Sequence, residues 1–431
     1  MRPLPWITAF VLGLTSLHAA PKLLRGPYLQ VATPNSMVLR WRTDALTPGL
    51  VRYGSTPQST TQQISHAGSL TEHIVLLTGL QPGTRYYYQI GSATNQWFTS
   101  PQGLDSFVTP PLPGTQKPTQ VWVLGDSGTA SLGQKAVRDA YAQWSTNRVP
   151  DLWLMLGDNA YASGTDLQFQ KGVFDIYPQT LRSSPLWPTL GNHDARSANS
   201  PTQSGVYYDI FTLPTLGQAG GLPSGTEAYY SFDYANIHFI CLDSQDTDRS
   251  PTGAMAQWLK ADLESTTRDW KICFFHHPPY TQGGHDSDDL KDSGGRMIQM
   301  RENFLPILES GGVDLVLTGH SHDYERSYLL KGAYGNSKQL LPQQVVNKGN
   351  GRSDGDGAYL MSKGPDSHTG TVYVVAGSSG QTGGGRLNHP AMYVSLNKLG
   401  SLILDIHGPE LTATFLTDQA KVRDYFTLRK E

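Results

Sequence analysis

Asp151-Leu-Trp-Leu-Met-Leu-Gly157-Asp158-Asn-Ala-Tyr161 is the stretch around which this chain is organised. Its apolar run, Leu152 to Leu156, predicts a short strand buried on both faces of a sheet. The run stops at Gly157, a carboxylate follows at once, and a tyrosine lies three residues further on. Functional side chains collect at such strand ends, because the loops there are free of sheet hydrogen bonding. Taken alone, the stretch is more simply a strand that leaves the core through a Gly-Asp turn.

The same pattern recurs along the chain, and the recurrence favours a functional site. Apolar runs also end at Gly125-Asp126-Ser-Gly128, Gly191-Asn192-His193-Asp194, Phe275-His276-His277-Pro278 and Gly319-His320-Ser-His322. A glycine before the first polar group lets the backbone turn close to something compact. Oxygen and nitrogen ligands without sulfur suit iron, manganese or zinc. The sequence therefore predicts two metals sharing a carboxylate, a pair that at ~3.5–4 Å can clamp a phosphate.

The region after residue 118 has the alternation of an α/β domain. Strands are predicted at 121–124, 152–156, 186–190, 237–242, 272–275, 313–317, 372–376 and 402–406, and helices at 134–144, 254–264 and 297–308. Such alternation implies βαβ crossovers and a layered domain. The segment Lys331 to Gly370 lacks periodicity and is expected to be a surface loop. Its Asp354-Gly-Asp356-Gly run lacks the full pattern of a calcium loop.

The region before it has the signals of a small antiparallel β domain. Met37 to Thr43 and Thr84 to Ile90 are rich in β-branched and aromatic residues between turns. Leu80-Gln-Pro-Gly-Thr-Arg-Tyr86 resembles the tyrosine corner of fibronectin type III sandwiches. We place this domain at 22–109, a stiff proline-rich linker at 110–118 and the α/β domain at 119–431. This division agrees with a length of 431 residues, which exceeds the usual single core.

Composition and the first residues indicate the class of protein. A formal net charge of −3 gives no indication of a nucleic-acid partner. Residues 1–20 have the positive start, apolar run and small-residue exit of a secretory signal peptide, and no later segment is predicted to cross a membrane. The mature protein is thus expected to be secreted or periplasmic. Cys241 and Cys273 form either one disulfide or two buried thiols. We favour the thiols, because so large a core does not need a disulfide to stabilise it.

The order Gly-Asp-x-Gly, Gly-Asp-x-x-Tyr, Gly-Asn-His-Asp, His before His-Pro-Pro, and Gly-His-x-His resembles the purple acid phosphatases of the metallophosphoesterase superfamily. The resemblance covers nearly the whole mature chain, because that family also carries a β-sandwich ahead of its catalytic domain. It implies a layered β-sandwich flanked by helices, preceded by a fibronectin III-like sandwich.

The resemblance also assigns the metal ligands. It implies that a ferric ion is held by Asp126, Tyr161 and His322, and a divalent metal (Zn²⁺, Mn²⁺ or Fe²⁺) by Asn192, His276 and His320, with Asp158 as the bridge. Tyr161 is the discriminating residue. A phenol titrates near ~10, so its ionisation at working pH requires a strongly acidic cation such as trivalent iron.

Residues next to the ligands are further candidates. His193 could donate to a phosphate oxygen or protonate the leaving alkoxide, and His285 resembles a substrate-contacting histidine of the family. His277 has either an outer packing role or a catalytic one. Asp194 stands where the family often has glutamate, which shortens the side chain without an obvious change in chemistry.

Three functions are compatible with these residues. The first is an exported acid phosphatase that hydrolyses small phosphate monoesters with a hydroxide held at the metal pair. A phosphodiesterase or nucleotide pyrophosphatase on the same scaffold is the second. An extracellular binding protein with a structural metal site is the third, but structural sites tend to be closed and to lack spare histidines beside them.

Overall fold

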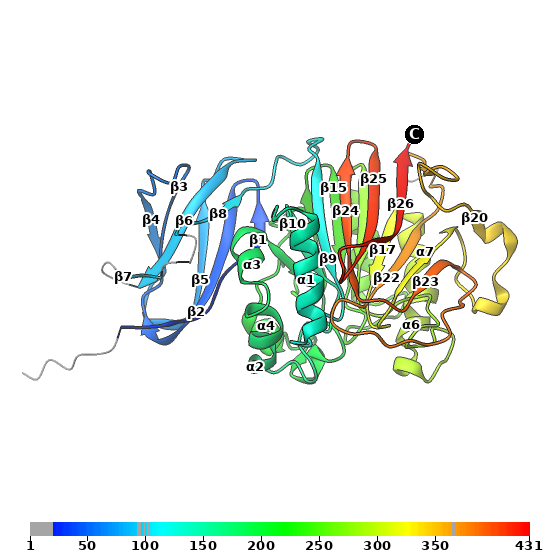
Figure 1. Ribbon diagram of the computed structural model, residues 1–431, viewed down its shortest axis with the longest axis horizontal. Coiled ribbons are helices and arrows are strands. Elements are labelled where there is room, and N and C mark those ends of the chain that lie inside the picture. The colour runs from blue at the N-terminus through cyan, green and yellow to red at the C-terminus, as the bar shows by residue number, and fades with distance from the viewer. Residues whose placement is uncertain (1–19, 93–95, 99, 101–102, 364–367) are drawn as a thin grey trace, which may run out of the picture.

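The computed structural model describes residues 20–92, 96–98, 100, 103–363 and 368–431. Figure 1 shows an all-β part at the left end of an elongated molecule, with two large sheets and their helices to its right. The predicted signal peptide lies outside the described residues, apart from Ala20.

The N-terminal part contains two antiparallel sheets. One has the order β1-β2-β5, and the other has the order β4-β3-β6-β7 with β8 also paired to β6. The strands are β1 (Leu23–Thr33), β2 (Ser36–Thr47), β3 (Leu50–Gly54), β4 (Gln62–Ser65), β5 (Leu70–Thr78), β6 (Arg85–Ser92), β7 (Gln96–Phe98) and β8 (Asp105–Val108). The predicted tyrosine corner is confirmed, because the Tyr86 hydroxyl accepts the N–H of Gln81 at 3.0 Å.

The rest of the chain contains two seven-stranded mixed sheets. The first runs β11-β10-β9-β24-β25-β26-β21 and the second β14-β15-β16-β17-β22-β18-β23. The strands of the first are β9 (Thr119–Leu124), β10 (Leu152–Met155), β11 (Leu186–Pro188), β21 (Tyr359–Met361), β24 (Gly400–His407), β25 (Glu410–Thr417) and β26 (Val422–Lys430). Those of the second are β14 (Tyr230–Tyr234), β15 (Ile237–Cys241), β16 (Trp270–Phe274), β17 (Leu315–Thr318), β18 (Tyr324–Ser327), β22 (Val372–Ala376) and β23 (Met392–Leu396).

The two sheets enclose a common core. Leu154 and Leu404 of the first sheet share one hydrophobic cluster with Phe239 and Leu317 of the second. All eight strand predictions in this region fall on observed strands, and each run of β9, β10, β11, β15, β16 and β17 is fully buried as expected.

Helices and short helical turns lie outside the sheets or connect their strands. They are α1 (Leu132–Trp144), α2 (Asp166–Phe169), η1 (Gln170–Phe174), α3 (Pro178–Ser183), η2 (Asp194–Arg196), α4 (Val206–Ile210), α5 (Ala254–Ser265), η3 (Asp292–Gly295), α6 (Arg296–Gln299), η4 (Met300–Phe304), α7 (Leu305–Ser310), η5 (Ser337–Gln339) and η6 (Pro342–Gln344). The helix predicted at 297–308 is interrupted by the π turn η4. Pro306 explains the irregularity, because proline lacks the N–H that a regular helix would use there.

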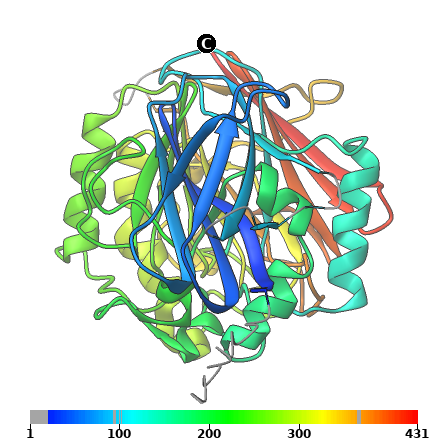
Figure 2. The same cartoon turned by 90° about the vertical axis from the view of Figure 1, so that its left-hand side faces the viewer.

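The N-terminal part packs firmly on the helical segment between β10 and β14. The Tyr28 hydroxyl donates to the carbonyl of Ile210 at 2.6 Å, and its ring lies 4.9 Å from that of Phe174. Arg25, whose side chain is fully buried, forms an ion pair with Asp166 at 2.9 Å. Figure 2 shows the N-terminal strands in front of the other sheets. The hydrophobic core therefore continues from one part into the other.

The described part of segment 331–370 contains more secondary structure than the sequence suggested. It contains β20 (Val345–Asn347), which pairs with β19 (Leu329–Leu330), and it contributes β21 to the edge of the first sheet. The prediction of a plain surface loop is therefore wrong for these strands. Tyr359 explains the attachment, since its ring is fully buried and its hydroxyl donates to the carbonyl of Gly349.

Both cysteines are free thiols, which rules out the disulfide alternative. Cys273 pairs with Ile240 rather than with Cys241 in the parallel register of β15 and β16. Successive side chains on a strand point to opposite faces. The two thiols accordingly belong to different hydrophobic clusters, one on each side of the sheet.

A buried ionic triad joins β14, β15 and α5. The ring nitrogens of His238 lie 2.7 Å from Asp233 Oδ1 and 2.9 Å from Asp262 Oδ2. Burial alone would lower the pKa of His238, but hydrogen bonds to the two carboxylates outweigh it and raise that pKa above 6.5. A carboxylate can only accept, so both ring nitrogens carry protons and the triad contains an imidazolium.

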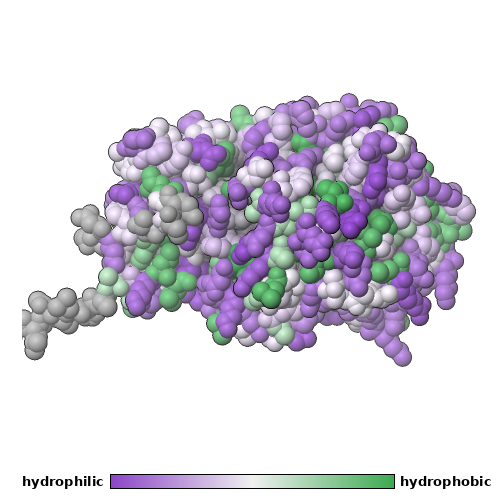
Figure 3. Space-filling model, in the orientation of Figure 1, coloured by the Kyte–Doolittle hydropathy of each residue, from purple (hydrophilic) through white to green (hydrophobic). Residues whose placement is uncertain are grey.

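The outer surface is mixed in character. Figure 3 shows a face that is largely polar, with small separate apolar patches. Among the residues that the structure describes, no helix is both long and apolar enough to pass through a membrane.

Candidate metal centre

The polar residues predicted at the strand ends meet where the two large sheets lie side by side. Asp126, Asp158 and Asn192 follow β9, β10 and β11 of the first sheet. His276 and His320 follow β16 and β17 of the second sheet. These strands are parallel within each sheet, so their carboxyl ends lie at the same edge.

The residues that the resemblance assigned to the ferric ion form one group. The Tyr161 hydroxyl lies 3.1 Å from Asp126 Oδ1 and 3.1 Å from His322 Nε2. His322 Nε2 is 3.6 Å from the same carboxylate oxygen. A phenol oxygen, a carboxylate oxygen and a ring nitrogen therefore converge on one point.

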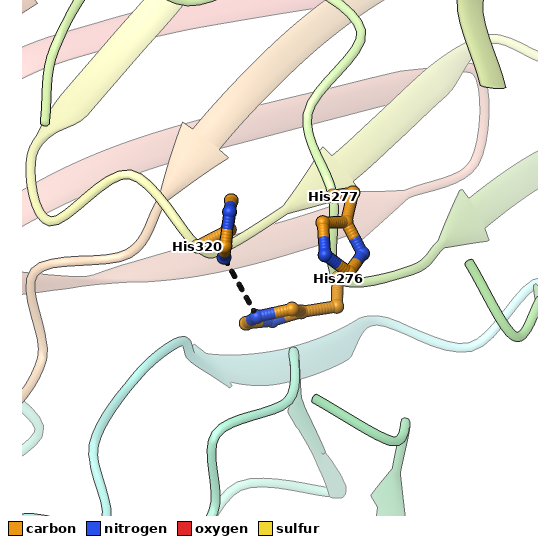
Figure 4. Close-up of side chains that lie close together, drawn as sticks. All are labelled: His276, His277 and His320. Atoms are coloured by element: carbon orange, nitrogen blue, oxygen red, sulfur yellow. Dashed lines mark hydrogen bonds between the residues drawn. The ribbon is translucent and has the colours of Figure 1, made fainter. Parts of the chain in front are cut away.

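The residues assigned to the divalent metal form a second group. His276 Nε2 lies 3.0 Å from Asn192 Oδ1 and 3.2 Å from His320 Nδ1. Figure 4 shows the two imidazole rings meeting at these nitrogens. Asp158 Oδ1 is 3.5 Å from His276 Nε2.

Asp158 lies between the two groups. Ligand atoms of Asp126, Asp158 and His276 all fall within 4.8 Å of one another, so one residue of each group is close to this carboxylate. Asp158 is 1% exposed, and its Oδ1 accepts the backbone N–H of His193 at 2.8 Å. A shared carboxylate in this position is what a pair of cations requires.

The second group is suited to a cation because the atoms that face one another carry lone pairs and no hydrogen. His276 Nδ1 lies 2.9 Å from the carbonyl of Leu156, which can only accept, so the proton is on Nδ1. The Ser293 hydroxyl uses its hydrogen on Asp292 and therefore accepts from His320 Nε2 at 2.6 Å. In neutral rings, His276 Nε2 and His320 Nδ1 are then both bare. Such an outer hydrogen bond on each histidine is the usual way in which proteins orient metal-binding imidazoles.

Close packing explains the glycines before the ligands. A Cβ on Gly157 would lie 2.5 Å from His276 Nδ1, and one on Gly319 would collide with the carboxylate of Asp126. The residues that follow, Asp158 and His320, have φ values of 51° and 69°. Left-handed backbone at non-glycine residues costs about 1–3 kcal/mol each and tends to persist at functional sites.

The electrostatic surroundings of Tyr161 favour the neutral phenol unless a cation is close. Burial, and then the carboxylates of Asp126 and Asp158, raise its pKa well above 10. Gln381 is a further polar neighbour, with its amide nitrogen 3.4 Å from His322 Nε2. A phenolate here needs a cation strong enough to overcome two carboxylates.

His193 and His285 lie beside different ligand candidates. His193 donates from Nδ1 to the carbonyl of Ala162 at 2.7 Å, and its Nε2 lies 3.8 Å from Asp158 Oδ2. His285 hydrogen-bonds Asp292 through Nδ1 at 2.8 Å and stacks on His320 with 3.8 Å between ring centroids. Both rings are partly exposed and keep Nε2 available.

His277 differs from these two because it is buried. It is 1% exposed, its Nδ1 lies 2.9 Å from the Ser244 hydroxyl, and its ring packs 4.4 Å from that of His320. Burial, followed by the charge of His276, lowers its pKa well below 6.5. The geometry fits the packing alternative.

Several residues of the site carried no sequence signal. Ser293 and Asp292 reach the histidines from η3, and Gln381 comes from the loop after β22. Only spatial proximity identifies these three residues. Asp194, which the Gly-Asn-His-Asp motif did include, has a structural task, since it accepts the N–H groups of Asn159 and Gly191.

Comparisons with known proteins agree with this arrangement. Residues 119–324 match the family described as calcineurin-like phosphoesterase, and residues 25–103 match the purple acid phosphatase N-terminal domain. This domain pair is that of the purple acid phosphatases. Both parts of the chain are thus similar to parts of the purple acid phosphatases, a group of metallophosphoesterases.

Individual relatives are distant. Purple acid phosphatase 18 of Arabidopsis thaliana is 29% identical over 317 residues, covering 70% of this chain and 65% of the relative. An uncharacterized protein of Mycobacterium tuberculosis is 28% identical over 360 residues, covering 76% of this chain and 62% of that protein. The chain thus spans less than two thirds of the length of these relatives.

A solved structure supports the fold. The purple acid phosphatase PPD1 from yellow lupin seeds superposes with a TM-score of 0.69 over 96% of this chain and 75% of that one, at 16% identity. The predicted fold class, a metallophosphoesterase fold behind an all-β region, is confirmed.

Proposed function

We propose that this protein is an exported acid phosphatase that hydrolyses small phosphate monoesters at a ferric and a divalent metal ion. Asp126, Tyr161 and His322 would hold the ferric ion. The divalent ion (Zn²⁺, Mn²⁺ or Fe²⁺) would be held by Asn192, His276 and His320, and Asp158 would bridge.

One observation carries the metal part of this proposal. His276 Nε2 and His320 Nδ1 lie 3.2 Å apart while the other nitrogen of each ring is committed to a neighbour. Two lone pairs so close would repel each other, and the carbonyl oxygen of the Asn192 side chain adds a third. A cation between them removes the repulsion.

When bound, the metals supply the nucleophile and neutralise charge on the phosphate. The protein residues then orient the ester and move protons. His193 donates its Nδ1–H to Ala162 and has Nε2 near Asp158, so in the doubly protonated ring Nε2–H can donate to a phosphate oxygen. His285 donates its Nδ1–H to Asp292, so in the doubly protonated ring it can deliver the Nε2 proton to the leaving alkoxide and remain as the neutral imidazole.

The experiment is metal analysis and visible spectroscopy of the purified protein. Phenolate bound to ferric iron should give a violet to pink tint with one iron and one divalent metal per chain. Tyr161→Phe should abolish the tint. Tyr208→Phe is the matched control, because it removes another buried hydroxyl, bonded to Ser200. A colourless protein that holds only zinc or manganese would contradict the ferric assignment.

Relative rates test the substrate. p-Nitrophenyl phosphate should be hydrolysed faster than bis(p-nitrophenyl) phosphate by the metal-loaded protein. The reverse order would favour the phosphodiesterase alternative and overturn the monoester assignment, whatever the metals are.

We also infer domain bounds of 22–109 and 119–431, with 110–118 as the linker. The family matches at 25–103 and 119–324 support this division, as do sheets that share no strand. After cleavage at a protease site inserted beside Gly114, the two pieces should still co-elute in gel filtration, because they share a core. Separate elution would contradict the shared core.

A further inference from the structure

A cavity of about 380 Å³ lies at the end of the sheets remote from the metal centre. Lys271, at the start of β16, and Lys430, at the end of β26, line it. His276 follows the opposite end of β16, so the cavity and the proposed metal ligands are separated by the length of this strand.

The lining of the cavity is basic. Arg268, Lys271, Lys363 and Lys430 line it, and Asp269 is the acidic residue among the described residues that do so. The charged floor is deeply buried, since Lys271 is 7% and Lys430 8% exposed. Asp269 and Lys363 are exposed at the rim.

The buried floor has more positive than negative charge. Lys430 Nζ forms an ion pair with Asp314 Oδ1 at 2.8 Å. Lys271 Nζ donates to the carbonyl of Gly311 at 2.7 Å, while its backbone N–H donates to the other oxygen of Asp314. Lys271 Nζ also donates to the carbonyl of Leu263 at 3.4 Å, and its ammonium has no carboxylate in direct contact. Each ammonium has three N–H donors, so at least one donor of each remains for a ligand.

A neighbouring histidine reports the same positive field. His368, which also lines the cavity, has its pKa lowered to about 4 by burial and then by Lys331, Lys430 and Lys271. Burial and the charge of Lys430 likewise lower the pKa of Lys271, against the opposing effects of Asp314 and Asp262. An anion in the cavity would relieve this repulsion, and a buried, unbalanced positive charge is otherwise costly.

We propose that this cavity is a second anion site, distinct from the metal centre, that binds the phosphate group of a small phosphorylated molecule. Lysine ammonium groups bind phosphate as point charges. The volume lies within the range of ligand pockets, roughly 300–1,000 Å³, and leaves room for an organic group beside the phosphate. Charge and volume support this site without reference to the proposed catalysis.

Calorimetric titration of the metal-loaded full-length protein tests the site. The probes are inorganic phosphate and phenylphosphonate, whose phosphorus–carbon bond resists hydrolysis, at low ionic strength where surface charge is least screened. Wild-type protein should bind both probes at the cavity in addition to any binding at the metals. Tighter binding of phenylphosphonate at the cavity identifies an organic phosphate, and equal binding identifies free phosphate as the ligand.

The decisive variant is Lys430→Gln combined with Asp314→Asn, which removes an ammonium without leaving a buried carboxylate unpaired. Arg268→Gln is a milder second variant. Each should weaken cavity binding, the double variant by about tenfold to a hundredfold, the effect of losing a hydrogen bond to a charged group. Lys135→Gln, an exposed change on α1, is the control and should change nothing.

The outcome separates this site from the proposed function. If the variants bind both probes with the same stoichiometry and affinity as the wild type, the cavity is not an anion site. If the metal centre binds no phosphate, the wild-type protein should still bind the probes at the cavity, and the variants should bind them more weakly. The inference then stands while the proposed function fails. Initial rates on p-nitrophenyl phosphate provide the independent readout of the metal centre.

Discussion

Ser293→Ala is expected to release the divalent metal selectively. The serine hydroxyl lies 2.6 Å from His320 Nε2 and 2.8 Å from Asp292 Oδ1. Its loss leaves the N–H of His320 without its acceptor, so the proton can move to Nδ1, the nitrogen assigned to the metal. Loss of such an outer partner typically weakens metal affinity about 10- to 100-fold, which is about 1.4–2.8 kcal/mol.

The backbone at this position should not obscure the result. Ser293 has a φ of 52°, and left-handed backbone has a similar free-energy cost for alanine and for serine. Ser244→Ala is the matched control, because it removes a hydroxyl from His277, a histidine of the same cluster that is not a proposed ligand.

The assay is metal content after dialysis against a series of chelators of increasing strength. Ser293→Ala should retain iron and lose the divalent ion at a chelator strength that leaves both in the wild type and in Ser244→Ala. If Ser293→Ala retains both metals as firmly as the wild type, the proposed protonation of His320 is wrong. If it loses iron first, the division of ligands between the two metals is wrong.

Three other changes should have distinct effects. Asp158→Asn should lower the content of both metals and reduce turnover more than any other single ligand change, because this residue alone is assigned to both ions; two retained metals with near-normal turnover would exclude the bridge. Gly319→Ala should lower metal affinity by roughly tenfold without loss of secondary structure, since overpacking of about 1–3 kcal/mol falls on the Asp126 carboxylate; circular dichroism and metal analysis together check this. His238→Gln should destabilise the protein by about 3–5 kcal/mol at pH 6, as expected when one partner of a buried ion pair is removed. The folded-state pKa of His238 is raised above its unfolded-state pKa of about 6.5. The stabilisation that His238 provides is therefore complete below the unfolded-state pKa and is lost as the pH rises through the folded-state pKa. In urea unfolding, the difference in unfolding free energy between wild type and His238→Gln should be smaller at pH 9 than at pH 6, and a larger difference at pH 9 would contradict the charged triad.

The parts of the fold that sequence could predict are those determined by local pattern. The buried runs of β9, β10 and β16 are continuous and apolar, and each ends where a ligand candidate begins. The C-terminal strands β25 and β26 were not predicted, although they pair in hairpins with sequence neighbours, because they alternate instead of forming the continuous apolar runs on which the predictions relied. Pairing with the distant β26 makes Tyr359–Met361 a strand inside a segment that has no periodicity of its own.

The same distinction explains which site residues were predicted and which were missed. The ligand candidates follow strands of fixed direction, so sheet topology alone brings Asp126, Asp158 and His276 together. Asp292 and Ser293 lie instead in η3, where Ser293 itself has a positive φ.

That turn connects the two sides of the site. His320 donates to Ser293, Ser293 donates to Asp292, and Asp292 also accepts from His285. His320, an assigned metal ligand, thus reaches the Asp292 carboxylate through one hydroxyl, and His285, the proposed proton donor, contacts the same carboxylate directly. Substitution of Asp292 should therefore disturb both metal retention and proton delivery, whereas substitution of His285 should disturb only the second.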